Sequence, residues 1–531
     1  MSGDDMRVHW ITALGACFVL AAQAIAEPKA LTVDQWQADL EQMTAAIREI
    51  HFKPFHVVSE DEFDTSVANL RNDIPTLSDQ DIILRMAQIV AALRDGHSRL
   101  QIPRLYPELA LQSELGHSGT PPPRVDSLRF RQLPVRFELF SDGLFVVGAT
   151  AEHHELIGQE VLLLDETSTD EAIAAVRAVS FFENDSRARL MAPDRLALPD
   201  VLNFLDISTT GAEITLTTIN NDGHTSRTIL SALDAEGRKL IDGAPQPKPM
   251  WRARRDEYRW HQVLADDDAI YVQVNEFEES PVIPYGDFVA EAIDAARDAG
   301  VNRFVIDLRH NSGGIGAWVT PFVTGLSRSE YNEYGRLYVL VSRETFSAAE
   351  HFLHRFEEYT YAAFVGEQSG AMPSHFGDPQ RIVLENSGLT LRVSTIYWHS
   401  WLANDFREAI NPHISVPYSS SDFFSASDPV LQAALDYDAP ENLALQIDEQ
   451  FRRGNNQNAL LMFVRYMSDA TIADHRQAIP ELLAMADRLV EDGYVRPGYF
   501  VYFLANQSYP GNPDVEASLE RIQELMNESD D

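Results

Sequence analysis

The stretch LYVLVSRETFSAAEHFLHRFEEY, residues 337–359, contains a strand-to-helix junction with a serine at the turn. The five leading apolar residues predict a buried strand, and the apolar spacing after Ser347 predicts a helix. Ser347 is therefore expected at the amino end of a helix, where backbone N–H groups lack partners within the helix. Two roles fit this position: the first residue of a capping box with Glu350, or a nucleophile.

Strands and helices alternate on both sides of this junction. The expected strands are 269–275, 303–309, 337–341 and 362–367, and the expected helices are 286–300, 316–326 and 347–359. Alternation of this kind predicts an α/β layer with parallel strands.

The N-terminal part of the chain has a helical pattern. Between Thr32 and Leu100, apolar residues recur at spacings of three and four, and Asp34 and Ser78 are the expected helix caps. This pattern predicts a helical unit that ends in the tetrapeptide Asp95-Gly96-His97-Ser98.

Two further regions complete the chain. Residues 133–233 contain strand-like runs separated by Gly, Asp and Asn turns, with one helix expected at 170–179, and predict a small β-rich module. Proline clusters at 121–123 and 245–249 mark the boundaries of this module. From Pro440 onward the pattern is helical.

The charge of the chain excludes some classes of partner. The sequence has 81 acidic and 42 basic residues, which give a formal net charge of -39. Nucleic acids and anionic membranes are polyanions, so neither is expected as a partner.

The first residues predict an export signal. Arg7 begins a weakly positive segment, Ile11 to Ala22 are largely apolar, and Ala24-Ile25-Ala26 fits a cleavage site. The only cysteine, Cys17, lies inside this signal; lipoprotein processing at Cys17 is the less favoured alternative. We expect a mature protein without disulfides, thiolate catalysis or cysteine-bound metal, in a bacterial periplasm or outside the cell.

Two more segments contain candidate functional residues. DLRHNSGGIG, residues 307–316, places Gly313 and Gly314 after a strand, where backbone N–H groups can turn toward a ligand, although an ordinary turn has the same pattern. No lysine follows the glycines, so this segment is not a P-loop. His97 follows a glycine at a helix end, where a helix-capping segment is the alternative to a catalytic role.

Together these three segments, in this order, resemble the C-terminal-processing, or tail-specific, serine peptidases, in the branch that includes the tricorn core protease. The resemblance covers Thr32 to Tyr437 and includes three later segments. These are Val365-Gly366-Glu367, His375-Phe376-Gly377-Asp378 and Ser427-Asp428-Pro429-Val430-Leu431.

The resemblance implies a multidomain fold with α/β and α+β parts around a crotonase/ClpP-like catalytic core. The implied regions are a signal peptide (1–26), an N-terminal helical unit (27–104), a linker and PDZ-like β-rich module (105–240), a catalytic domain (250–437) and a C-terminal helical region (438–531). A PDZ-like module would take an extended peptide as an added strand.

The resemblance also implies roles for individual residues. Ser347 is the nucleophile, and the amides of Ala348 and of Gly313 or Gly314 form the oxyanion hole. The best-known members pair the serine with a downstream lysine, but this sequence has no lysine after Lys248. The tricorn-like branch uses a histidine from the N-terminal lead, and His97 stands at that place.

Several assignments stay open at this point. His375 is the second candidate for the base, and His351 and His354 are the last. The acidic residue that orients the base is Glu408 or Asp405. The serine beside the base in the tricorn-like pattern has no match before His97, since Gly96 stands there and Ser98 follows.

The expected function is that of an exported serine endopeptidase that hydrolyses peptide bonds through an acyl-enzyme on Ser347. The alternative is a non-catalytic peptide- or ligand-binding protein with the same fold. A lipase of the α/β-hydrolase kind is disfavoured because G-x-S-x-G is missing, and no H-E-x-x-H occurs. We expect a polypeptide substrate, no cofactor, no metal and no membrane insertion after signal cleavage, and leave the oligomeric state open.

Overall fold

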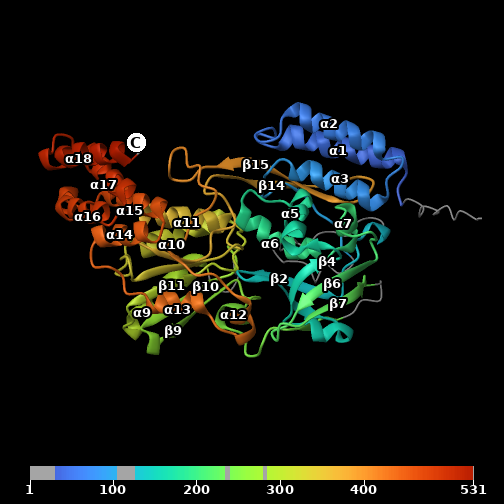
Figure 1. Cartoon of the computed structure of the whole chain (residues 1–531), viewed down its shortest axis with the longest axis horizontal. Helices are drawn as coiled ribbons and strands as arrows, with labels where there is room; N and C mark the ends of the chain where they lie inside the picture. Colours follow the sequence, from blue (N-terminus) through green and yellow to red (C-terminus); the bar gives the residue numbers. More distant parts are fainter. Residues whose placement is uncertain (1–29, 105–125, 234–238, 279–283, 530–531) are drawn as a thin grey trace, which may run out of the picture.

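The computed structural model describes residues 30–104, 126–233, 239–278 and 284–529. Within these ranges the chain forms a mixed helix and sheet structure with three sheets (Figure 1). The proposed signal peptide and the proline cluster at 121–123 lie outside the described residues.

A six-stranded sheet contains the strands that alternate with helices in the sequence. Its order is β16-β13-β12-β11-β10-β9, and every neighbouring pair is parallel except β9 with β10. The strands are β9 (Arg259–Leu264), β10 (Ala269–Val274), β11 (Arg303–Asp307), β12 (Leu337–Val341), β13 (Ala363–Gly366) and β16 (Ile414–Ser415). The predicted α/β layer is therefore present, with one antiparallel strand at its edge.

Helices cover both faces of this sheet, because its central strands are apolar on both sides. One face packs against α9 (Tyr285–Ala299), α10 (Val319–Leu326) and α11 (Ala348–Tyr359). The other face packs against α13 (Pro429–Asp436), with α8 (Met250–Ala253) and α12 (Ser420–Ser425) nearby. The carboxyl ends of β11 and β12 run into the loops that carry the glycine pair and Ser347.

The β-rich region forms a second, antiparallel sheet. Its main path is β2-β3-β4-β6-β7, with β5 and β8 attached. The strands are β2 (Val135–Phe140), β3 (Gly143–Ala149), β4 (Glu160–Leu164), β5 (Thr167–Ser168), β6 (Glu213–Ile219), β7 (Thr225–Ser231) and β8 (Ile241–Asp242). Three helices lie between its strands where one was expected: α5 (Thr169–Val176), α6 (Asp185–Leu196) and α7 (Pro199–Phe204).

The N-terminal helical unit is not separate from this module. Its helices α1 (Val33–Ile50), α2 (Glu60–Asp73) and α3 (Asp79–Ala91) share one hydrophobic core with the second sheet. The third sheet, β1-β15-β14, joins this unit to the α/β region, because β1 (Arg99–Leu100) pairs with the long hairpin of β14 (His375–Val383) and β15 (Thr390–Trp398). Figure 1 shows this hairpin running below α1 and α2.

The helix caps of this unit agree only in part with the sequence pattern. Ser78 caps α3 and accepts from the amide of Asp81, as predicted. The cap of α1 is Thr32, not Asp34, because Thr32 and Gln35 form a reciprocal capping box.

The C-terminal region is helical, as predicted, and has a core of its own. Its helices are α14 (Leu443–Arg452), α15 (Asn456–Ser468), α16 (Ile479–Glu491), α17 (Val495–Ser508) and α18 (Pro513–Ser529). Figure 1 shows them on the side of the molecule opposite α1 and α2. Short 3₁₀ turns complete the chain at 126–128, 151–156, 177–179, 265–267, 316–318 and 475–478. Among the described residues, no helix has the length and apolar character needed to cross a membrane.

Candidate active site

Ser347 occupies a strained backbone position between β12 and α11. Its φ of 57° and ψ of -119° lie in a region that residues with a side chain rarely adopt. The side chain makes no cap hydrogen bond to the helix, so the capping-box interpretation is wrong. Glu350, the other half of that box, instead accepts from the hydroxyl of Ser369 at 3.1 Å. The turn leaves the Ser347 hydroxyl half-buried and directed away from its own helix.

His97 meets this hydroxyl from the distant N-terminal unit. Its Nε2 lies 2.8 Å from Oγ of Ser347 across 250 residues of sequence. The pairing of β1 with β15 holds the segment after His97 against the α/β region. Asp95 orders the segment before it, because its carboxylate accepts from the main-chain N–H of His97 at 2.8 Å and contacts Nε2 of His51 at 3.1 Å.

The surroundings of His97 keep its ring uncharged. Burial, and next the nearby His375, hold the pKa of His97 well below its usual range, although Asp95 acts to raise it. The ring stacks on Phe346 with a centroid distance of 4.4 Å. Its Nδ1 is buried and has no hydrogen-bond partner among the described residues. The arrangement therefore supplies a neutral imidazole with one nitrogen on the serine.

The glycine pair lies directly beside Ser347. A Cβ added to Gly313 would fall 2.7 Å from Cβ of Ser347, and one added to Gly314 would fall 2.5 Å from the carbonyl oxygen of Phe277. Gly313 donates its N–H to the side chain of Asn311 at 2.9 Å. In the described part of the chain, no hydrogen bond uses the N–H of Gly314 or of Ala348. Gly314 and Ala348 are therefore the pair of amides open to a ligand.

Neither expected acidic residue reaches His97. The side chain of Glu408 is exposed, and its carbonyl oxygen accepts from Asn184 at 2.9 Å. Asp405 is buried in contacts with Arg407 and Ser400. No hydrogen bond among the described residues joins either carboxylate to His97. The assignment of Glu408 or Asp405 as the orienting residue therefore has no support in the geometry.

The other candidate histidines lie close to His97 but make different contacts. His375 stacks with His97 at a centroid distance of 5.5 Å, and its Nδ1 contacts the carbonyl of Met372 at 2.8 Å. His351 lies 4.9 Å from the ring of His375 and bonds to His354 at 3.0 Å. Burial lowers the pKa of His375 to about 4. Within the described residues none of these three histidines bonds to Ser347, and no acidic and histidine cluster is arranged to hold a metal ion.

Two carboxyl groups lie near the site: Glu350, which the sequence suggested only as half of a capping box, and Glu183, which was not identified from the sequence. Burial raises the pKa of Glu350, which lies one turn after Ser347, and of Glu183, which accepts from the amide of Met372 at 3.3 Å. Asp95 behaves in the opposite way: burial acts to raise its pKa, but His51, His97 and neighbouring hydroxyls hold it well below its usual range. The only sequence feature that could have indicated either group is the helical pattern around Glu350, which predicts that this residue lies on the helix that begins after Ser347.

Comparison with known proteins establishes the fold. No protein-family model and no curated protein sequence matches this chain. This chain is similar in structure to mature CPAF complexed with lactacystin. The match covers 76% of this chain and 99% of the CPAF chain, with a TM-score of 0.52 and 13% sequence identity. A crystal structure of mature CPAF matches 80% of this chain and 98% of its own, with a TM-score of 0.50 and 13% identity.

The tricorn protease also matches, over 79% of this chain and 37% of its own, at 13% identity. Its TM-score is 0.36. The chain thus has the fold of mature CPAF, at an identity that transfers no activity by itself.

Proposed function

We propose that this chain is a serine peptidase of the tail-specific kind, an exported endopeptidase that hydrolyses polypeptides. The observation that carries the proposal is the 2.8 Å contact between Nε2 of His97 and Oγ of Ser347. A nucleophile and its base within hydrogen-bond distance, beside open backbone amides, are the requirements of acyl transfer. The description of the core as crotonase/ClpP-like and of the second sheet as PDZ-like belongs to the same proposal.

The proposed reaction begins with attack of the Ser347 oxygen on the carbonyl carbon of a peptide bond. His97 takes the hydroxyl proton on Nε2, a role worth about 10²- to 10⁴-fold in rate. The N–H groups of Ala348 and Gly314 stabilise the oxyanion, and one such donor contributes about 2.7 to 4 kcal/mol. His97 then gives the proton to the leaving amine. In the second half of the reaction, water attacks the acyl-enzyme, His97 takes a proton from this water, and the proton returns to the Ser347 oxygen as the acid product leaves.

The environment of His97 supports this role. A histidine with a lowered pKa is neutral at pH 7, which is the form that a general base needs. The carboxylate of Asp95 acts to raise that pKa, so it favours the imidazolium that forms during the reaction. In this proposal Asp95 is a positioning residue, since it holds the main chain of His97.

The unpartnered Nδ1 of His97 favours a second candidate, a non-catalytic binding protein with the same fold. In the serine–histidine enzymes a hydrogen bond to the second ring nitrogen fixes the orientation of the base. A binding protein would not need that bond.

Hydrolysis of an unstructured polypeptide separates the two candidates. We expect the mature chain to cleave such a substrate, Ser347→Ala to abolish cleavage, and the exposed control Ser425→Ala to cleave at the wild-type rate. No cleavage by wild type would favour the binding protein, and equal cleavage by wild type and Ser347→Ala would reject Ser347 as the nucleophile. Fusion of residues 1–26 to a reporter that is active only outside the cytoplasm tests export.

A further inference from the structure

A large cavity is bordered by the loops that carry Asn311 and Ser347, at His310 and Glu344. It has a volume of about 580 Å³ and lies between β2, α6, the segment around α8 and the ends of β11 and β12. Ser347 and His97 are not among its lining residues. The cavity is therefore a second site, separate from the serine–histidine pair.

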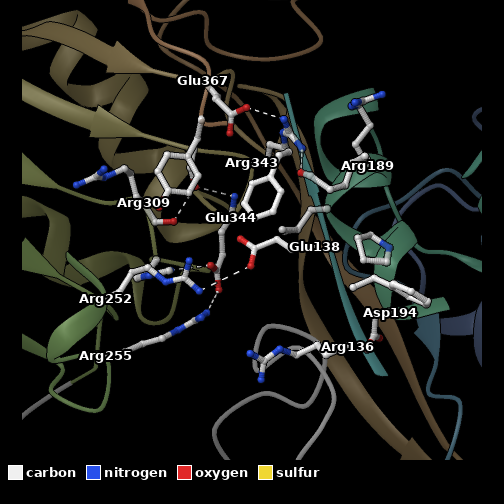
Figure 2. A pocket seen from close by; sticks show the side chains of 18 of the residues that line it. Arg136, Glu138, Arg189, Asp194, Arg252, Arg255, Arg309, Arg343, Glu344 and Glu367 are labelled. Carbon is white, nitrogen blue, oxygen red and sulfur yellow. Dashed lines mark hydrogen bonds and ion pairs between the residues drawn. The ribbon is translucent and has the colours of Figure 1, made fainter. Parts of the chain in front are cut away.

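The lining of this cavity is richer in basic than in acidic side chains. Seven cationic residues line it against five acidic ones, in a chain with nearly twice as many acidic as basic residues. The cationic residues are Arg136, Arg189, Lys248, Arg252, Arg255, Arg309 and Arg343. The acidic residues are Glu138, Asp194, Asp242, Glu344 and Glu367. Figure 2 shows Arg252 and Arg255 near Glu344, with Glu138 facing them.

Most of these charged side chains are in ion pairs, but the guanidinium of Arg252 has a nitrogen atom without a hydrogen-bond partner among the described residues. Arg309 bonds to Asp428 at 2.7 and 2.8 Å, and Arg343 bonds to Glu367 at 2.6 Å. Arg252 has a longer ion pair with Glu138, at 3.7 Å. Its Nη1 is buried without a hydrogen-bond partner among the described residues.

Three more buried polar atoms in the lining lack partners in the described part of the chain. They are Nε1 of Trp251, which is 7% exposed, Nε2 of His310, whose side chain is 6% exposed, and the hydroxyl oxygen of Tyr418. The rings of Trp251 and His310 stack at a centroid distance of 4.5 Å, and Tyr418 meets Trp251 edge-on at 5.5 Å, so these atoms belong to one cluster. Buried polar groups are normally hydrogen-bonded, and a group of four without partners in one cavity indicates a ligand that supplies the partners.

We propose that this cavity is a binding site for an oxyanion, a carboxylate, phosphate or sulfate group, held by Arg252, Trp251 and His310. The guanidinium and indole groups can only donate, so the ligand must accept. Arginine suits this role because its planar donors match the geometry of such anions. The cavity volume admits a larger molecule that carries the anionic group.

Binding is coupled to a proton on His310. Its Nδ1 lies 2.9 Å from a carboxylate oxygen of Glu344, which only accepts, so Nδ1 carries the hydrogen and Nε2 of the neutral ring has none. The charged groups that face this ring are Glu344, Arg255 and Arg252. Burial, and next Arg255, lower the pKa of His310 to about 4. An anion at Nε2 requires the ring to gain a proton, so binding is tighter at lower pH.

The cavity also has a direct connection to the loops at Ser347. The contact between His310 and Glu344 joins the loop after β11 to the loop after β12. The first loop continues into Asn311, whose carbonyl accepts from Phe346, the residue before Ser347, at 3.1 Å. An occupant that changes the charge on His310 therefore changes the reactivity of Ser347. This last step alone rests on the proposed function.

Calorimetric titration of the mature chain with sodium sulfate at constant ionic strength tests the site, because sulfate does not titrate near neutral pH. We expect saturable binding that is tighter at pH 5.5 than at pH 7.5, with proton uptake detected by comparing buffers of different ionisation enthalpy. Arg252→Gln should weaken binding about tenfold, the cost of one charge-assisted hydrogen bond. The control Arg297→Gln removes an exposed cation of α9 that pairs with Glu330, and should bind as wild type does.

Further titrations identify the source of the anion. A short peptide with a free carboxyl terminus is compared with its amide; binding of the free acid alone assigns a polypeptide end, and binding of sulfate alone assigns a free oxyanion. No saturable binding of either probe, or equal binding by wild type and Arg252→Gln, overturns the proposal. Sulfate binding that persists in a chain whose Ser347 is inert would retain this site and reject the proposed function.

Discussion

The loops around Asn311 and Ser347 have two faces with opposite electrostatic character. On the Ser347 face, His97 and His375 are buried and His351 is half-buried, and burial lowers the pKa of each, so the rings are neutral at pH 7. On the cavity face, most arginines are in ion pairs with carboxylates, among them Arg309 with Asp428 and Arg343 with Glu367. The difference shows how one pair of loops can keep a neutral base beside a nucleophile and still hold charges suited to an anion.

Replacement of His97 should have the largest effect on the Ser347 face. We expect His97→Gln to reduce hydrolysis about 10²- to 10⁴-fold, because the serine loses its proton acceptor. The measurement is the initial rate of polypeptide cleavage. His224→Gln, at an exposed turn, is the control and should cleave normally. A small effect of His97→Gln combined with a large effect of His375→Gln would move the base to His375.

Crowding the glycine pair should have the next largest effect. In Gly313→Ala the new Cβ would lie 2.7 Å from Cβ of Ser347, at a φ of 114°. We expect about a 10²-fold loss of hydrolysis, comparable to the loss of one oxyanion donor. Gly223→Ala has a similar backbone strain at φ 79° but nothing within 4 Å, and should change only the melting temperature. Equal activity of the two variants would contradict the close packing of Gly313 against Ser347.

The pH dependence of the Ser347 face should show the lowered pKa of His97. A base with a lowered pKa stays neutral as the pH falls through 6.5, so the reaction of Ser347 with a fluorophosphonate should keep its rate there. The midpoint of the rate profile is expected below 6.5. A midpoint at or above 6.5 would mean that burial does not control this histidine.

The smallest expected effect concerns stability. Burial raises the pKa of Glu350, so the folded chain binds this proton more tightly than the unfolded chain does. The contribution of Glu350 to the free energy of unfolding is therefore greatest below about pH 4.5 and falls as the pH rises toward its folded pKa. Glu350→Gln should remove this loss, giving a flatter melting profile between pH 5 and 8. If the melting temperature of Glu350→Gln depends on pH as steeply as that of wild type, the raised pKa of Glu350 is not the cause of the pH dependence.

The alternating pattern of strands and helices was sufficient to predict the α/β layer, because buried parallel strands are continuous apolar runs, such as β12. The contact between His97 and Ser347 had no local signal, since it depends on the pairing of β1 with β15. The capping-box interpretation of Ser347 was wrong because the tight turn before α11 directs its side chain away from the helix.

The cavity was beyond prediction for a related reason. Arg252, His310 and Glu344 come from separate segments and meet only in the folded chain. Glu408, by contrast, was predicted from the sequence pattern but does not reach the site. A residue at a plausible place in the sequence pattern has its carboxylate in solvent, because only its main chain is held by Asn184.

Whether Ser347 is the nucleophile is tested by treating the mature chain with a fluorophosphonate and mapping the modified peptide by mass spectrometry. We expect a single stoichiometric adduct on Ser347, with labelling slowed about 10²-fold or more in His97→Gln. An adduct on another residue, or a Ser347 that remains unmodified in the folded chain, would contradict the assignment of this serine as the nucleophile.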